Sequence, residues 1–126
     1  MKGLLFSNSH EWVKIDHDIA TVGISDYAQS QLGDVVFIEL PQEGSSFDKN
    51  SQFATIESTK TASEVYMPLS GEVIKVNSEL TNNPQWINND PYDKGWIVKL
   101  KIKNISETES LMKDDAYKDF VEKEAH

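Results

Sequence analysis

The segment Ile56-Glu57-Ser58-Thr59-Lys60-Thr61-Ala62-Ser63-Glu64-Val65-Tyr66 decides how this chain can fold. Apolar residues at its two ends enclose a polar centre, which is typical of two strands joined by a reversal. The pattern predicts a hairpin with arms at 53–56 and 62–67 and a tip near 57–61. Lys60 stands near the middle of that tip. Its side chain is expected to be exposed and mobile, and therefore poorly placed to be a desolvated catalytic amine.

Short strands and turn signals extend from this hairpin in both directions. The expected strands are rich in β-branched residues or alternate polar and apolar positions. They lie at 11–15, 19–24, 34–40, 72–77 and 95–102. Ser25 is placed to cap a short helix that Gly33 ends. Residues 82–92 are dense in asparagine and proline and are expected to form a loop.

The C-terminal segment has a different pattern. Ser106 and Glu109 match a capping box, and apolar residues then recur at roughly helical spacing, so a helical tail is expected over about 106–125. The pair Asp114-Asp115 can divide this tail into two helices. Taken together, the pattern predicts a mostly β fold, a flattened antiparallel barrel or sandwich with a short internal helix and a helical tail. The length suits a single domain over residues 1–126.

Composition excludes several classes of function. The chain has 21 acidic residues and 12 basic residues, all lysines, for a formal net charge of −9. It therefore lacks the positive surface of a nucleic-acid binder. It has no cysteine, so disulfides, thiolate metal sites and cysteine nucleophiles are excluded, and a redox group would have to be borrowed. No apolar run approaches the length of a membrane span, and no signal peptide is recognisable, so a cytoplasmic location is expected.

Two local clusters resemble catalytic or metal sites but do not support them. Ser9-His10-Glu11 has the residue types of a catalytic triad, yet consecutive residues on a strand point to alternate faces. Asp16-His17-Asp18 is better explained as a solvated turn than as a metal site. We therefore expect no catalytic residue, no metal and no enzymatic activity.

The hairpin resembles a known cofactor-attachment site. Residues 56–66, followed by Pro68-Leu69-Ser70-Gly71, are similar to the attachment hairpin of the biotinyl/lipoyl domain superfamily, in which the tip lysine carries the cofactor. Biotin carriers usually flank this lysine with methionines, where this chain has threonines. The form Glu57-Ser58-Thr59-Lys60 resembles the glycine cleavage H-protein family. Further segments resembling that family occur in order at 9–13, 23–29, 32–41 and 77–96.

This resemblance implies a carrier that holds lipoate in amide linkage on Lys60. Such a carrier moves the aminomethyl group of glycine from glycine decarboxylase to aminomethyltransferase, and its dithiol to dihydrolipoyl dehydrogenase. Lipoate-attaching enzymes are further implied partners. By matching position, Glu11 would keep the amine of the loaded arm protonated in a cleft, with Ser9 as its hydrogen-bond neighbour. Glu64 stands where the family often has aspartate. We expect a monomer, because the arm must visit several enzymes.

Other hypotheses use the same residues. The lysine could relay lipoate or octanoate to other lipoyl proteins, or it could carry biotin. The chain could also be an interaction domain with no cofactor. On the residues alone, Lys60 is one of twelve lysines and Glu11 is a solvated strand carboxylate.

Overall fold

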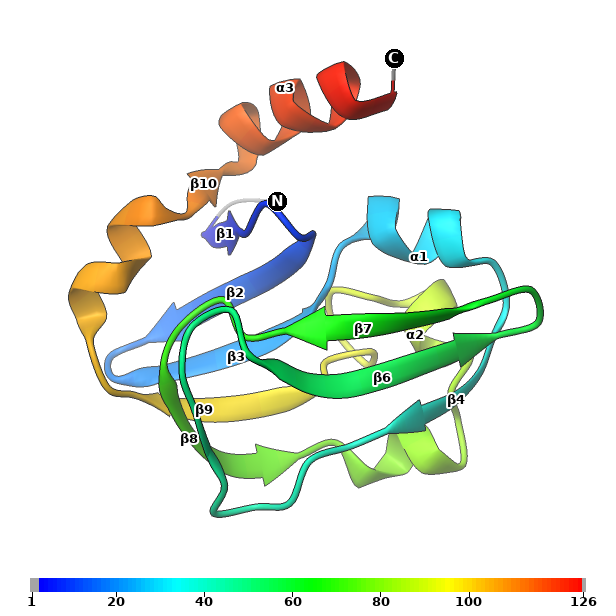
Figure 1. Ribbon diagram of the computed structural model, residues 1–126, viewed down its shortest axis with the longest axis horizontal. Helices are drawn as coiled ribbons and strands as arrows, with labels where there is room; N and C mark the ends of the chain where they lie inside the picture. Colours follow the sequence, from blue (N-terminus) through cyan, green and yellow to red (C-terminus); the bar gives the residue numbers. More distant parts are fainter. Residues whose placement is uncertain (1–2, 126) are drawn as a thin grey trace.

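The computed structural model describes residues 3–125, and its strands form two antiparallel sheets (Figure 1). The strands are β1 (Leu4–Phe6), β2 (Glu11–Asp16), β3 (Ile19–Ile24), β4 (Val35–Glu39), β5 (Ser46–Phe47), β6 (Gln52–Ser58), β7 (Ala62–Tyr66), β8 (Gly71–Val76), β9 (Val98–Ile102) and β10 (Met112–Lys113). The larger sheet has the order β10-β1-β2-β3-β9-β8-β5, and the smaller has the order β4-β6-β7. The expectation of a mostly β, antiparallel fold is confirmed, and the two sheets do not join into a closed barrel.

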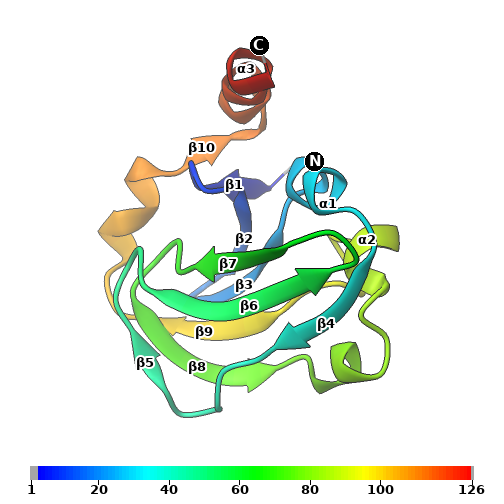
Figure 2. The same cartoon turned by 45° about the vertical axis from the view of Figure 1, so that its right-hand side comes forward.

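The helical elements lie mainly at the ends of the sheets. They are α1 (Asp26–Leu32), η1 (Ser78–Thr81), α2 (Trp86–Asn89), η2 (Ile105–Ser110) and α3 (Asp114–Ala125), where η marks a 3₁₀ turn. Figures 1 and 2 both show α1 and α2 at the same end as the tip of the β6–β7 hairpin. No helix among residues 3–125 is long and apolar enough to cross a membrane.

The core forms where the two sheets face each other. Alternate residues of the strands point inward and are fully buried, among them Val22, Leu100 and Ile56. A second apolar cluster forms around Phe6, Trp12 and Tyr117 and holds α3 against the outer side of β1 and β2. The cross-strand partner of Trp12 is Gly23, and only a glycine leaves room for the indole at this position.

Most of the expected elements are confirmed. Strand β3 and the capped helix α1 have the expected bounds, and Ser25 accepts a hydrogen bond from the N–H of Ala28 as the helix cap. The hairpin reverses where the sequence indicates, between β6 and β7. The expected division of the tail is confirmed in part, because α3 begins at Asp114 but is preceded by the 3₁₀ turn η2 and the strand β10 instead of a second α-helix.

Three details were wrong. The expected loop at 82–92 contains the short helix α2, and the last long strand begins at Val98 instead of residue 95. The capping box at Ser106 is not formed, because Asn104 caps η2, which is followed by the short strand β10. β10 pairs with β1. Two- and three-residue strands such as these depend on a distant partner for their hydrogen bonds, so local sequence gives little sign of them.

Candidate functional site

A serine closes the tip of the β6–β7 hairpin. The N–H of Ser58 donates to the carbonyl of Thr61 at 2.8 Å. The Ser58 hydroxyl oxygen accepts from the N–H groups of Thr61 at 3.1 Å and Lys60 at 3.3 Å. Short polar side chains that bond to nearby backbone groups favour turns over continued strand. The turn thus fixes the backbone of Lys60 and leaves its side chain exposed to solvent.

The tip also rests on the turn that joins α1 to β4. The N–H of Thr59 donates to the carbonyl of Asp34 at 3.0 Å. Gly33 lies against the lysine side chain, because a Cβ on this glycine would stand 3.2 Å from the Lys60 Cε atom. Gly33 has a φ of 80°, a left-handed conformation that ends α1 and favours glycine. The lysine therefore projects from a backbone held by two turns.

Asn88 of α2 holds this second turn in place. Its side-chain oxygen accepts from the N–H of Val35 at 2.8 Å. Its side-chain nitrogen donates to the carbonyl of Gly33 at 2.8 Å and to the side chain of Gln29 at 3.0 Å. One amide thus joins α1, α2 and the start of β4. Asn88 was not among the candidate residues, because its position in an asparagine-rich loop gives no sign of these contacts.

A cleft of about 370 Å³ opens beside the tip, between α1, β7 and the segment 9–11. Its floor is apolar and includes Leu32, Ile56 and Val65. Its polar wall contains Ser9, His10, Glu11, Tyr27, Glu64 and Glu124. Three carboxylates and no lysine of the described chain line it, and one of the three, Glu124, lies against His10. An apolar floor with a negative wall suits a ligand that has an aliphatic body and a cationic end.

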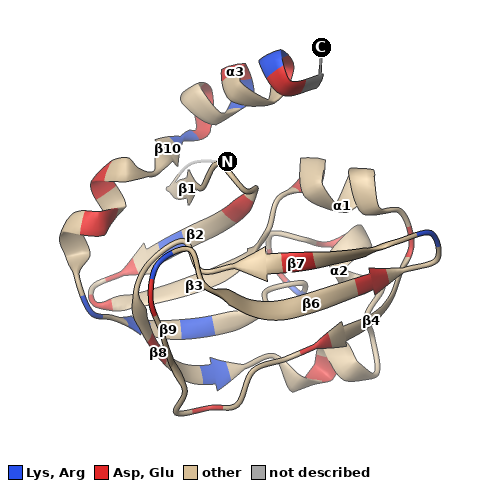
Figure 3. Cartoon of the chain, viewed as in Figure 1, with Lys and Arg blue, Asp and Glu red and all other residues tan. Residues whose placement is uncertain are grey.

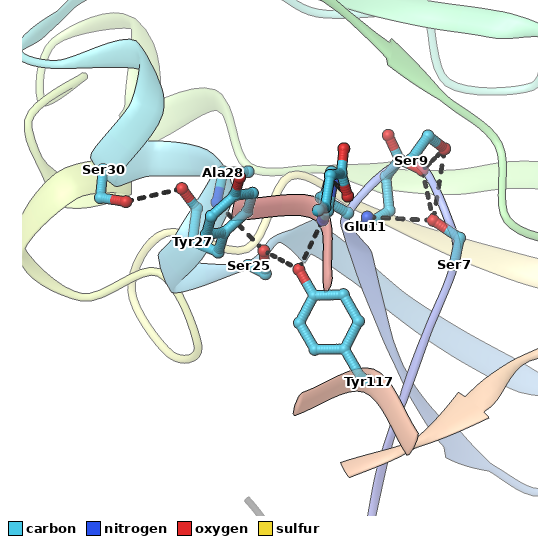
Figure 4. Close-up of polar contacts among 10 residues, drawn as sticks. Ser7, Ser9, Glu11, Ser25, Tyr27, Ala28, Ser30 and Tyr117 are labelled. Carbon is cyan, nitrogen blue, oxygen red and sulfur yellow. Dashed lines mark hydrogen bonds and ion pairs between the residues drawn. The ribbon is translucent and has the colours of Figure 1, made fainter. Parts of the chain in front are cut away.

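Glu11 is the buried carboxylate of this wall, with only 2% of its surface exposed. The hydroxyls of Ser7 and Ser9 donate to its Oε1 atom at 2.6 and 2.5 Å (Figure 4). The N–H of Tyr66 donates to its Oε2 atom at 3.2 Å, which ties β2 to the free edge of β7. Burial raises the pKa of Glu11 above its ordinary value, and the three hydrogen bonds oppose that rise. The alternative of a solvated strand carboxylate is therefore wrong.

The structure brings Ser9, Glu11 and Glu64 to one cleft. Glu64 lies on its exposed rim, and its Oε2 atom accepts from the Tyr66 hydroxyl at 2.5 Å. This hydrogen bond, followed by the charge of Glu64, raises the pKa of Tyr66. Lys60 itself lies just beyond the cleft, which the next residues, 61 and 62, help to line.

The C-terminal helix closes one side of the cleft through His10. The Nδ1 atom of His10 lies 2.7 Å from the Tyr117 hydroxyl, and its Nε2 atom lies 3.0 Å from the Glu124 carboxylate. The same hydroxyl lies 2.6 Å from the Ser25 hydroxyl that caps α1 (Figure 4). Burial raises the pKa of Tyr117 to about 12. His10 and Tyr117 are 107 residues apart, so no local pattern in the sequence indicates this network.

Among residues 3–125, no group of histidine and carboxylate side chains is arranged to hold a metal ion. Ser7 and Ser9 both donate to the Glu11 carboxylate, whereas the His10 ring contacts Tyr117 and Glu124. The Lys60 amine is an exposed group at this end of the fold that could accept a covalent cofactor.

Comparison with known proteins agrees with this geometry. The family model for the glycine cleavage H-protein matches residues 4–124. A glycine cleavage system H protein of Xanthobacter autotrophicus is 52% identical over 122 residues, which cover 97% of this chain and 98% of the relative. The mitochondrial glycine cleavage system H protein 3 of Arabidopsis thaliana is 48% identical over 124 residues, which cover 98% of this chain and 75% of the relative. The crystal structure of a glycine cleavage system H protein from Mycobacterium marinum matches with a TM-score of 0.85 and 30% identity, over 93% of this chain and 94% of that one. The chain therefore belongs to the glycine cleavage H-protein family.

Proposed function

We propose that this chain is the lipoyl carrier of a glycine cleavage system, with lipoate attached to Lys60. Family membership supports a carrier role in glycine cleavage. The proposed partners are glycine decarboxylase, aminomethyltransferase, dihydrolipoyl dehydrogenase and a lipoate-attaching enzyme. Residues 1–126 would act as one non-catalytic carrier domain. A monomeric state and a cytoplasmic location stay predictions from the sequence.

The residues at the hairpin tip fit such a cofactor. An amide bond to lipoate needs an amine that another enzyme can reach, and Lys60 is exposed at the end of the hairpin. Ser58 and the carbonyl of Asp34 hold the backbone on either side of it. The fixed backbone and the exposed side chain of Lys60 together suit an arm that must reach into other proteins. This exposed, supported amine is the observation on which the proposal depends.

When bound, lipoate would supply a dithiolane that is reduced as it takes up the aminomethyl group of glycine, and the dithiol left after transfer would be reoxidised to the dithiolane. The chain contributes the anchor and a high effective concentration of the arm wherever the carrier docks. With no cysteine, it also brings no thiol of its own to react with a disulfide.

The cleft has a second part in the proposal, which is to protect a protonated amine. A carboxylate near an ammonium group raises the pKa of that group and keeps its lone pair occupied by a proton. Glu11 is suited to this because its Oε1 atom accepts from Ser7 and Ser9, which fixes the carboxylate in place. Its burial strengthens the interaction with any cation that enters the cleft, because little water remains to screen it. Glu64 would add negative charge at the rim.

An intact-mass measurement on protein from its native host tests the attachment. We expect a fraction of the chain to carry the mass of one lipoyl group, and peptide mapping to place it on Lys60. The Lys60→Arg variant keeps the charge and should remain unmodified. Native protein without the group, or with the group on another lysine, would contradict the proposal.

The role of Glu11 has its own test. In Glu11→Gln the cleft loses its buried negative charge, so the glycine-loaded carrier should release ammonia faster than the parent. Ile74→Thr is a matched control, because Ile74 is exposed on β8 and does not line the cleft. An unchanged rate of ammonia release in Glu11→Gln would remove this role.

The alternatives differ in their support. Family membership argues against a biotin carrier and against an interaction domain with no cofactor. A relay of lipoate or octanoate to other lipoyl proteins would use the same lysine and stays a prediction.

A further inference from the structure

Two consecutive apolar side chains are exposed on β4. Val36 is 54% exposed and Phe37 is 45% exposed, whereas Val35 and Ile38 on either side are buried. A regular strand turns neighbouring side chains to opposite faces. The pairing of β4 with β6 shifts register between Val35 and Phe37, and this irregularity places both side chains in solvent. Bulges of this kind redirect side chains and are common beside functional sites.

This apolar pair lies close to the lysine tip. Val35 pairs with Ser58, the residue that closes the tip, and Phe37 pairs with Glu57 on the same strand. The carbonyl of Asp34 holds the tip through the N–H of Thr59. β4 is also an edge strand, since β6 is its one partner in the smaller sheet. Val36 and Phe37 are thus exposed on an edge strand, next to the hairpin tip that carries Lys60.

Carboxylates surround the pair. Asp34 precedes the pair, Glu39 follows it on β4, and Glu57 lies on the adjacent strand β6. All three carboxylates are exposed. Figure 3 shows acidic residues along β4 and β6 and a basic residue at the tip of the β6–β7 hairpin. In the described chain none of these three carboxylates takes part in an ion pair. An apolar centre with an unpaired acidic rim is complementary to a surface with an apolar pocket and basic side chains around it.

We propose that Val36 and Phe37 are the docking anchor for the enzyme that acylates Lys60, which presents an apolar pocket bordered by lysine or arginine. This inference rests on the proposed attachment of lipoate at Lys60. The length of the lysine side chain distinguishes between the possible partners. In an unmodified lysine, the Nζ atom lies only about 6 Å from the Cα atom. An enzyme that acylates this amine must therefore bring its surface against the tip and the neighbouring start of β4. Enzymes that act on the much longer lipoyl arm are free to dock farther away.

The test is the rate of acylation of the unmodified chain by a lipoate–protein ligase with lipoate and ATP, followed by intact mass. The double variant Val36→Thr/Phe37→Ser should lose at least tenfold in kcat/KM, mainly through a higher KM. The control Ile74→Thr/Ile105→Ser removes two apolar side chains that are 43% and 57% exposed elsewhere, and it should stay within twofold of the parent. Higher salt should lower kcat/KM for the parent, because the acidic rim contributes to encounter.

Further measurements separate docking from folding. Phe37→Leu retains an apolar anchor and should recover most of the rate, and thermal melts show whether each variant is folded. Equal acylation of the folded double variant and the parent would overturn the inference and leave the proposed function intact. Failure of the parent itself to accept lipoate at Lys60 would instead contradict the proposed function. Normal acylation of the double variant, with loss only of reduction by dihydrolipoyl dehydrogenase, would assign the surface to a different partner and would also overturn the inference.

Discussion

Replacing Glu11 tests how its carboxylate joins the two sheets, and two substitutions should act in opposite ways. In Glu11→Ala, the Tyr66 N–H and the hydroxyls of Ser7 and Ser9 lose their shared acceptor. Losing such partners in a buried site costs about 2 to 3 kcal/mol in the free energy of unfolding. For a domain of this size, that corresponds to a fall of about 8 to 12 °C in Tm.

Glu11→Gln should not lower the free energy of unfolding as Glu11→Ala does. The amide oxygen can accept from the Tyr66 N–H, and the amide nitrogen can donate to the two hydroxyls once these rotate. The substitution also removes the cost of holding a charge in a buried site, which is the main reason that the pKa of Glu11 is raised. We therefore expect Glu11→Gln to be at least as stable as the parent at neutral pH.

The pH dependence of the free energy of unfolding tests the charge of Glu11 more directly than a measurement at one pH. Because the folded pKa of Glu11 lies above its unfolded value of 4.5, the folded state retains a proton that the unfolded state releases between the two values. The contribution of Glu11 to stability is thus complete below pH 4.5 and is lost as pH rises through the folded pKa. Urea unfolding of the parent and Glu11→Gln from pH 4 to 8 measures the difference between them, in which the other carboxylates largely cancel. A parent that gains stability over Glu11→Gln as pH rises would refute this reasoning.

Three other predictions use contacts away from Glu11. Gly23→Ala should lower the free energy of unfolding by about 1 to 3 kcal/mol, because its Cβ would stand 2.6 Å from the buried Trp12 ring. An unchanged midpoint of urea unfolding would contradict this. Asn88→Ala should speed amide hydrogen exchange at Val35 and Thr59 more than in the core strands, since the turn beneath the tip loses its support; uniform exchange would count against it. Tyr117→Phe should remove a tyrosinate transition near pH 12 in ultraviolet absorbance. The stability that neutral Tyr117 provides in the parent is present below pH 10 and is lost between pH 10 and about 12.

Local patterns were sufficient for the elements that carry their own signals. The hairpin around Lys60 has apolar arms and a polar tip, and α1 has a serine at its start and a left-handed glycine at its end. The burial of Glu11 also has a local signal. It has the same strand parity as Val13, which is fully buried, so alternation along β2 already places it on the inner face.

Other features depend on segments that are distant in the chain. Trp12 has the outward parity of β2, yet it is buried, because the C-terminal cluster around Tyr117 covers that face and its Nε1 atom donates to the carbonyl of Pro91. Asn88 supports the lysine tip only because α2 packs against α1. Sequence periodicity describes one element at a time, so it cannot report contacts that arise when a third element covers an outer face.

The arrangement of the tip separates two requirements that conflict in a carrier. Under the proposed function, a partner must find Lys60 in a defined place, and the lipoyl group on it must move freely afterwards. The hydrogen bonds at Ser58 and Asp34 fix the backbone, and the exposed Lys60 side chain keeps its rotational freedom. The cleft that contains Glu11 begins at residues 61 and 62, directly after Lys60, so the proposed lipoyl arm would have a partly enclosed site within reach. A tip that was itself flexible would add the entropy of ordering the backbone to every docking event, and the weak, repeated binding that a carrier needs would be harder to achieve.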